Sequence, residues 1–253
     1  MLASPDDLAV MQGMRLKNSE KNKMTRDHNG FRKLIIVLTK AGKVLALHTG
    51  DGRVVWSFLI PSLRTSESCQ YPSALNLHQW QVPHHHAMDE NPSVLVVGRC
   101  GVNSDAPGVL SVIDSYTGKE RSSEKLAHSV VHIIPLPFTD SKEQRLHLIM
   151  DANFRAHLYP RTQESKNIFL HEISNAYWHS VDTTRGIIIG HTYKSKCNLD
   201  VSDDYCFDTK ELWSIVLPTE SEKIATIATR KMNEVLLSIY FLLCYSFYIQ
   251  LHI

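Results

Sequence analysis

Three consecutive histidines, His84, His85 and His86, are the residues whose type most readily suggests metal binding. They follow Val82-Pro83 in a stretch that we expect to be a loop. Consecutive side chains on an extended backbone point to alternate sides, so three neighbouring imidazoles rarely converge on one ion. We therefore predict no metal site at these histidines and none elsewhere in the chain.

Five cysteines are spread thinly along the chain and form no Cys-x-x-Cys pair, which argues against a zinc finger or a thioredoxin-like site. Cys197 and Cys206 lie close together in a polar stretch between two strand-like segments. In an oxidising compartment they could form a disulfide that closes this loop. Two free thiols are the alternative, and the sequence leaves both states open.

The candidate nucleophiles lack the partners that catalysis needs. Cys100 follows a strand-like run and Ser111 lies within one, yet neither belongs to a Gly-x-Ser-x-Gly elbow. Asp203 and Asp204 have no spacing that suggests a catalytic pair, and we expect them in a solvated loop. Neither a P-loop nor a Gly-x-Gly-x-x-Gly motif occurs. We predict no catalytic residue, no cofactor-binding residue, no cofactor, and a protein that is not an enzyme.

The charge of the chain is nearly balanced, with 27 basic and 26 acidic residues among 253. A nucleic-acid-binding protein usually carries a dense basic stripe, and none occurs here, so we expect no nucleic-acid partner. Residues 1–30 are polar and lysine-rich, and we expect a linker or short helix there. Asp6 and Asp7, with no apolar run after them, predict no signal peptide.

Short runs of β-branched and aliphatic residues, separated by turn-forming residues, begin at Leu34 and are typical of many short strands. In the clearest unit, 34–61, Gly50-Asp51-Gly52 supplies the positive φ angles that a tight hairpin needs. The expected strands of this three-strand meander are 34–38, 44–47 and 54–59. We expect no long helix between residues 34 and 230.

The same plan returns three more times with large insertions, as expected for the blades of a β-propeller. The expected strands of these copies are 94–98, 108–114, 146–150, 154–159, 168–173, 178–181, 186–191 and 212–217. The sequence therefore predicts an all-β fold, a partial β-propeller of three to four blades over residues 31–234. The positions that we expect to be buried are Ile35, Val37, Val44, Leu45, Trp56, Val96, Leu110, Ile113, Leu148, Ile188, Trp213 and Ile215.

A tryptophan follows a turn in two of these copies. Trp56 follows the glycine hairpin of the first unit, and Asp208–Trp213 is a shortened version of the same pattern. Asp114–Lys119 carries the Thr-Gly-Lys turn without the tryptophan. The pattern resembles the tryptophan-docking repeat of pyrroloquinoline-quinone-type propellers, in which the indole packs flat between neighbouring blades. An antiparallel β-sandwich with a Gly-Asp hairpin is the alternative fold.

The segment 235–253 is almost entirely apolar, and no charge follows Glu234. Its length is near the roughly 20 residues that span a bilayer. A propeller strand, a C-terminal membrane anchor and a chance hydrophobic stretch compete as interpretations. We expect a hydrophobic helix that projects from the β-body and allows membrane association. We interpret it as the end of a truncated or alternatively spliced isoform.

Longer strings of sequence are more specific than the repeat. They occupy 40–61, 77–100, 111–120, 128–140, 144–151 and 211–235. Together they resemble the largest, propeller-bearing subunit of the ER membrane protein complex in a plant-like version, and the resemblance runs from about Phe31 to Val235. It identifies the chain as an internal fragment of that family.

The resemblance implies a non-enzymatic scaffold in a complex that inserts transmembrane segments into the ER membrane. Its implied partners are the other subunits of that complex and client membrane proteins. Its implied location is the ER membrane, on the lumenal side. Two alternatives stay open, a stand-alone propeller-like protein-binding module and a degenerate quinone-dependent dehydrogenase fragment. The adjacent cysteines that many quinone enzymes carry do not occur here.

Overall fold

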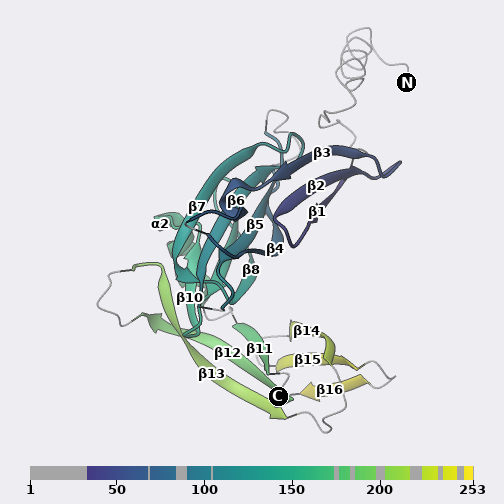
Figure 1. Ribbon diagram of the computed structural model, residues 1–253. Helices are drawn as coiled ribbons and strands as arrows, with labels where there is room; N and C mark the ends of the chain where they lie inside the picture. Colours follow the sequence, from purple (N-terminus) through teal and green to yellow (C-terminus); the bar gives the residue numbers. More distant parts are fainter. Residues whose placement is uncertain are drawn as a thin grey trace. The chain divides into compact units, whose positions relative to one another are not determined.

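Figure 1 shows the computed structural model of the chain. It describes residues 33–252 except 68, 84–89, 104, 174–176, 183–185, 198–202, 217–223, 233–235 and 244–247. Our expectations for residues 1–30 and for His84–His86 lie outside the described residues. The part of the chain that is described contains sixteen strands and one α-helix, which confirms the all-β prediction.

The chain divides into two compact units. Unit 1 consists of Met1–Ala176 and Tyr193–Thr209, and unit 2 consists of Tyr177–Thr192 and Lys210–Ile253. The long strands β12 (Ile187–Lys196) and β13 (Cys206–Val216) each contribute residues to both units.

The first sheet of unit 1 is the predicted meander. Its antiparallel strands are β1 (Leu34–Leu38), β2 (Lys43–His48) and β3 (Val54–Leu59). Gly42 and Gly52 have φ angles of 75° and 71° in the two connecting turns, a conformation that glycine adopts without steric penalty. The short 3-10 helix η1 (Pro61–Leu63) leads to the next sheet.

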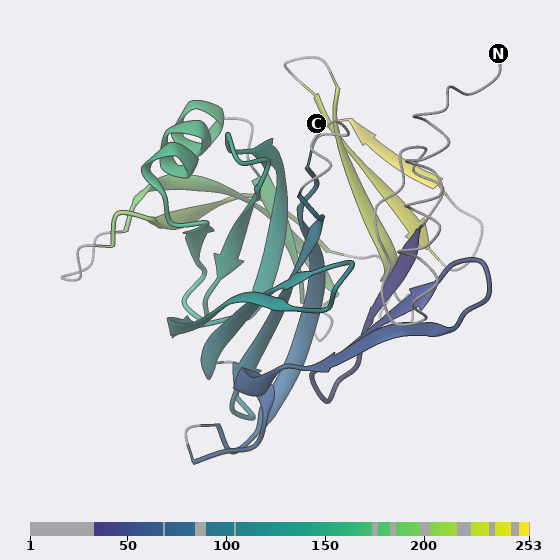
Figure 2. The same ribbon diagram turned by 90° about the horizontal axis from the view of Figure 1, so that it is seen from above.

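The second sheet of unit 1 has four antiparallel strands in sequence order. They are β4 (Pro72–Gln81), β5 (Ser93–Cys100), β6 (Pro107–Asp114) and β7 (Glu120–Ser129). Figure 2 shows this sheet beside the first one. Alternate residues of β5 enter two different cores, because strand side chains point alternately to opposite faces. Val94 and Val96 pack with the first sheet, whereas Leu95 and Val97 pack with residues of the third.

The third sheet of unit 1 begins with another antiparallel meander. Its strands are β8 (His132–Thr139), β9 (Arg145–Met150) and β10 (Arg155–Tyr159). The first residues of β13 pair with β10, with Ala156 opposite Phe207. Helix α2 (Gln163–Glu172) lies between β10 and β11 in the chain.

The prediction of a strand at 168–173 was wrong, because these residues belong to α2. The hydroxyl of Thr162 caps the helix by accepting a hydrogen bond from the Ser165 N–H at 3.1 Å. The helix buries only Ser165 and Phe169. Phe169 packs edge-on against Phe207 with ring centroids 4.7 Å apart. A helix that buries so narrow a face leaves little helical periodicity in its sequence.

Unit 2 contains an antiparallel pair and a separate three-stranded sheet. In the pair, β11 (Tyr177–Asp182) lies opposite β12. The separate sheet has the strands β14 (Ile224–Met232), β15 (Leu236–Leu243) and β16 (Tyr248–His252), with β15 in the centre.

The prediction of a hydrophobic helix at 235–253 was therefore wrong. Residues 236–243 and 248–252 are strands, and no helix in the described part of the chain has the length and apolarity to cross a membrane. Continuous hydrophobicity does not distinguish a buried strand from a helix, whereas β-branched and aromatic residues favour strands.

Most of the positions predicted to be buried are confirmed. Val44, Trp56, Val96, Leu110, Ile113, Leu148 and Ile188 are all buried. Ile35 is instead 52% exposed, and Val37, Leu45, Trp213 and Ile215 are only partly buried. The error in β1 has a simple cause: Leu34, Ile36 and Leu38 face the core, so the residues between them face away.

Candidate functional site

Trp56 joins the first two sheets of unit 1. Its indole is 8% exposed, and its Nε1–H donates a hydrogen bond of 2.9 Å to the carbonyl of Ser115 in the β6–β7 turn. A Cβ atom added at Gly118 would lie 2.6 Å from the Trp56 ring. Gly118 also has a φ of 71°. The indole thus packs between neighbouring sheets, as the repeat predicted, and it lies directly on the turn glycine of the next sheet, which was not predicted.

The other repeat tryptophan is placed differently. A Cβ atom added at Gly190 would lie 2.1 Å from the Trp213 indole, and both residues lie in unit 2 on the neighbouring strands β12 and β13. Trp213 therefore covers a glycine of the adjacent strand in its own sheet, in contrast to Trp56.

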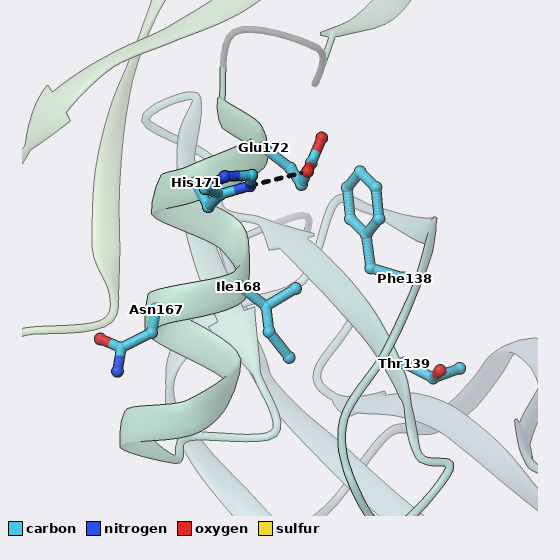
Figure 3. Close-up of a pocket in the computed structure, with 6 residues that line it drawn as sticks. All are labelled: Phe138, Thr139, Asn167, Ile168, His171 and Glu172. Carbon is cyan, nitrogen blue, oxygen red and sulfur yellow. Dashed lines mark hydrogen bonds and ion pairs between the residues drawn. The ribbon is translucent and has the colours of Figure 1, made fainter.

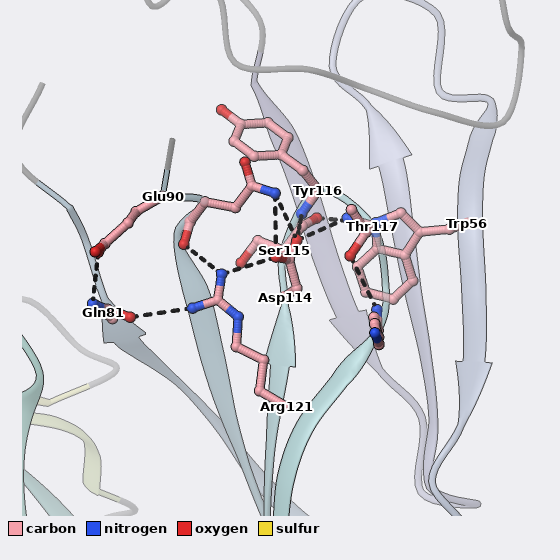
Figure 4. Close-up of polar contacts among 10 residues, drawn as sticks. Trp56, Gln81, Glu90, Asp114, Ser115, Tyr116, Thr117 and Arg121 are labelled. Carbon is pink, nitrogen blue, oxygen red and sulfur yellow. Dashed lines mark hydrogen bonds and ion pairs between the residues drawn. The ribbon is translucent and has the colours of Figure 1, made fainter. Parts of the chain in front are cut away.

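Asp114 organises the turn on which Trp56 lies (Figure 4). Its Oδ1 accepts hydrogen bonds from the backbone N–H groups of Tyr116 and Thr117 at 3.0 and 2.9 Å. Its Oδ2 accepts from Arg121 Nη2 at 2.8 Å and from Asn91 Nδ2 at 3.2 Å. A carboxylate with this many donors fixes the turn that receives the indole.

The Asp114 network continues to the third sheet through Arg121 and Gln81. Arg121 Nη1 donates to Gln81 Oε1 at 3.2 Å (Figure 4), and Gln81 Nε2 donates to the Lys142 carbonyl at 2.8 Å. Gln81 is 8% exposed and forms an isolated β-bridge with Gln144. Polar contacts therefore link the second sheet to both of its neighbours, and they make unit 1 a firmly connected frame.

The pKa of Asp114 predicts how this frame responds to acid. Burial alone would raise the pKa, but hydrogen bonds from Arg121, Thr117 and Asn91 outweigh burial and hold it below the ordinary value of 3.8. A carboxyl with a lowered folded-state pKa stabilises the fold above its unfolded pKa and loses that contribution as pH falls through the folded pKa.

We therefore expect Asp114→Asn to melt at a lower temperature than the wild type at pH 7, with the difference shrinking below about pH 4. Thermal melting between pH 7 and pH 3 measures this. A difference between the two proteins that stays constant over the whole range would contradict the assigned role of the ionised carboxylate.

A small pocket lies beside the Trp56 junction, between β1 and the second sheet. Its volume is about 290 Å³, and Leu34, Ile36 and Leu77 are among the apolar residues that line it. The hydroxyl of Ser93, which also lines the pocket, is buried and has no hydrogen-bond partner. The pocket wall therefore combines apolar side chains with polar residues that include His78, Gln79 and Ser93.

A second, more open hollow of about 440 Å³ lies along α2 and the end of β8 (Figure 3). Phe138 and Ile168 form its apolar wall, and the His171–Glu172 ion pair at 2.8 Å lies at its upper end in the picture. A hollow of this kind on a β-scaffold can accept a side chain of a protein partner more readily than it can enclose a small substrate.

Asp203 is held more firmly than the sequence suggested. Its carboxylate lies 3.0 Å from Arg161 Nη2 and 3.6 Å from His157 Nδ1, and its side chain is 18% exposed. The other ring nitrogen of His157 contacts Asp151 at 3.1 Å. Our expectation of a solvated loop residue was wrong for Asp203, because its partners come from β10 and the segment after it. Asp204 contacts Lys166 and Lys196 at the surface.

His128 and His147 in unit 1 have lowered pKa values that favour the neutral imidazole. His128 stacks on His157 with centroids 3.6 Å apart, and burial followed by repulsion from His157 lowers its pKa to about 4. Burial lowers the pKa of His147, which packs on Trp80, to about 3. Neutral, packed imidazoles of this kind contribute to the core. In the described residues no group of three or more histidine, cysteine or acidic side chains is arranged to hold a metal ion.

The residues considered as nucleophiles have other partners. Cys100 forms a disulfide with Cys69, and the Ser111 hydroxyl donates to Glu120 at 2.7 Å. In unit 2, Ser180 Oγ lies 2.9 Å from His191 Nε2, and Trp178 stacks on that imidazole. The Ser180–His191 contact lies between paired strands and was not anticipated from the sequence.

Two disulfides occur in unit 1. Cys197 and Cys206 are bridged with Cα atoms 5.4 Å apart, and Cys69 and Cys100 with Cα atoms 4.9 Å apart. Both Cα distances fall within the range that disulfides require. Sequence reasoning missed the second bridge because its cysteines are 31 residues apart, Cys69 before β4 and Cys100 at the end of β5.

Known proteins of one family are similar in sequence to this chain. Residues 30–243 match the family model described as "ER membrane protein complex subunit 1, second beta-propeller". The chain is 20% identical over 213 residues to ER membrane protein complex subunit 1 of Xenopus laevis, and 21% identical over 216 residues to that of Gallus gallus. Each alignment covers 83% of this chain and 20% of the relative, so the chain spans about a fifth of the length of these relatives.

Proposed function

The chain belongs to the family of ER membrane protein complex subunit 1, and from this membership we propose that it is a non-enzymatic scaffold in such a complex. The observation that carries the proposal is the match to the second β-propeller of that subunit over residues 30–243. The relatives are named as subunits of a complex, which makes other subunits the expected partners of this chain.

The frame built by Trp56 and Asp114 supports a scaffold role. A protein that holds partners in fixed positions needs sheets that do not move against each other. In unit 1 the indole hydrogen bond and the Arg121–Gln81 network connect three successive sheets. In this proposal the scaffold supports a complex that inserts transmembrane segments into the ER membrane, with client membrane proteins as transient partners.

The two disulfides support a lumenal location. Structural disulfides form and persist in oxidising compartments such as the ER lumen, and they are rare in the cytosol. Both bridges of this chain lie in unit 1. We therefore propose that unit 1 lies on the lumenal side of the ER membrane.

Affinity purification of the tagged protein from ER membranes solubilised in mild detergent tests the proposal. We expect the other subunits of the complex to be recovered in constant proportion to the tagged chain. Recovery of unrelated soluble proteins alone would favour a stand-alone binding module, and quinone-dependent dehydrogenase activity of the purified protein would overturn the non-enzymatic assignment.

A further inference from the structure

Three hairpin turns of unit 1 are built to the same hydrogen-bonding plan. They are residues 39–43, 140–144 and 151–155. In each turn the first N–H donates to the fifth carbonyl, and the fourth N–H donates to the first carbonyl. The side-chain oxygen of the first residue, Thr39, Asp140 or Asp151, accepts from the fifth N–H.

This plan places the fourth residue in the left-handed region, where side chains meet a steric penalty. The fourth residues are Gly42, Glu143 and Phe154, with φ angles of 75°, 58° and 59°. Glycine is the residue that suits such a position, and a bulky residue there is unusual. The turn would therefore form more easily with glycine than with Phe154, so the aromatic ring must serve another purpose.

The Phe154 ring is presented outward on a firmly held turn. Phe154 makes contacts within the chain, yet 56% of its surface remains exposed. Its carbonyl accepts a hydrogen bond of 2.8 Å from Thr209 Oγ1 on β13. The Ala152 N–H donates to Ser129 Oγ at 2.9 Å, which fastens the turn to the end of β7. The ring is thus offered from a preorganised support.

A second exposed apolar side chain lies on the adjoining turn. Val131 is 50% exposed, and its N–H donates to the carbonyl of Met150, the residue before the Phe154 turn, at 2.8 Å. Arg155 and Asp208 lie 4.0 Å apart beside Phe154, and both are partly exposed. An aromatic centre with apolar and charged neighbours has the composition of a protein–protein hot spot.

We propose that Phe154, with Val131 on the adjoining turn, is an anchor that inserts into an apolar pocket on another protein subunit of the complex. The inference rests on the proposed function for the existence of that partner. The strain at Phe154 is offset in the assembly because the buried ring contributes to binding.

Three variants test the anchor in the purification described above. Phe154→Gly should lower recovery of one partner subunit roughly tenfold or more, while its melting temperature stays equal or rises by up to about 4 °C as strain is relieved. Glu143→Gly is the matched control, because it makes the same backbone change in the equivalent turn. It should leave recovery unchanged. Phe154→Tyr should retain most of the binding.

The outcomes separate this inference from the proposed function. If the wild type recovers its partners and Phe154→Gly recovers them equally well, the anchor is wrong and the scaffold stands. A marked fall in the melting temperature of Phe154→Gly would also overturn the anchor, because the ring would then be needed for folding. If the wild type recovers no other subunit, the scaffold proposal fails and the anchor fails with it.

Discussion

Replacing Trp56 by alanine is expected to lower the stability of unit 1 by about 3–5 kcal/mol, the usual effect of removing a large buried aromatic side chain. The indole is 8% exposed and packs in the core shared by the first two sheets. Its loss would leave a cavity at the junction and remove the hydrogen bond to the Ser115 carbonyl. Urea denaturation followed by circular dichroism measures the change.

Two glycine variants show whether the effect comes from the docking contact. Gly118 and Gly52 have the same φ of 71°, but only Gly118 has the Trp56 ring above it. A Cβ at Gly52 would meet nothing within 4 Å. Gly52→Ala therefore measures the effect of the backbone conformation alone, on the order of 1–2 kcal/mol. Gly118→Ala should destabilise clearly more.

The excess effect of Gly118→Ala should largely disappear when Trp56 is already alanine, because the colliding ring is then absent. A double-mutant cycle isolates this coupling between the two sheets. Equal effects of Gly118→Ala in the presence and absence of the indole would show that the docking contact does not connect the sheets.

The meander of β1, β2 and β3 could be predicted because local signals agree there. Aliphatic runs alternate with glycine turns, and Gly52 has the positive φ that the hairpin signal suggested, whereas Gly50 does not. The burial of Trp56 and its packing between neighbouring sheets followed from the repeat. In such segments local propensity and the final fold point to the same answer.

The errors lie where tertiary contacts decide. Helix α2 depends on the Thr162 cap and on Phe169, whose partner Phe207 is far away in sequence. Phe154 adopts its left-handed conformation because the Asp151 turn fixes it. The partner of Phe169 is not visible in a local window of sequence. The Asp151 turn is local, but a phenylalanine at a position that favours glycine gives no turn signal in the sequence.

In the candidate site, too, local features could be predicted from the sequence and contacts between distant residues could not. The turn at Gly118 followed from its sequence, but its contact with Trp56 did not. The network from Asp114 to Gln81 joins residues 33 positions apart along the chain through Arg121. Hydrogen bonds between distant segments leave no periodic signal. The contact of Asp203 with His157 was missed for this reason.

Removal of the disulfides is the second change with a large expected effect. In the chain-entropy model a cross-link stabilises a protein by restricting its unfolded state, and the gain increases with loop length. The Cys69–Cys100 bridge spans 31 residues and the Cys197–Cys206 bridge spans 9. We expect a loss of about 4 kcal/mol for the Cys69→Ser/Cys100→Ser pair and about 3 kcal/mol for Cys197→Ser/Cys206→Ser.

The two bridges should also differ in what their loss does locally. Cys197 and Cys206 flank the segment that carries Asp203, and the Cys197 N–H donates to the Cys206 carbonyl at 3.0 Å. Opening this bridge should release Asp203 from Arg161 and His157, which hydrogen exchange of β10 would detect. Opening the other bridge should leave β10 protected.

Mass mapping of non-reduced peptides from ER-derived protein decides whether the bridges exist in the cell. We expect both pairs to be oxidised, because a lumenal protein of this family would fold among disulfide-forming enzymes. Cysteine pairs that are free thiols in that sample would remove the chemical argument for a lumenal unit 1. The family membership would stand, because it rests on residues 30–243 as a whole and not on the cysteines.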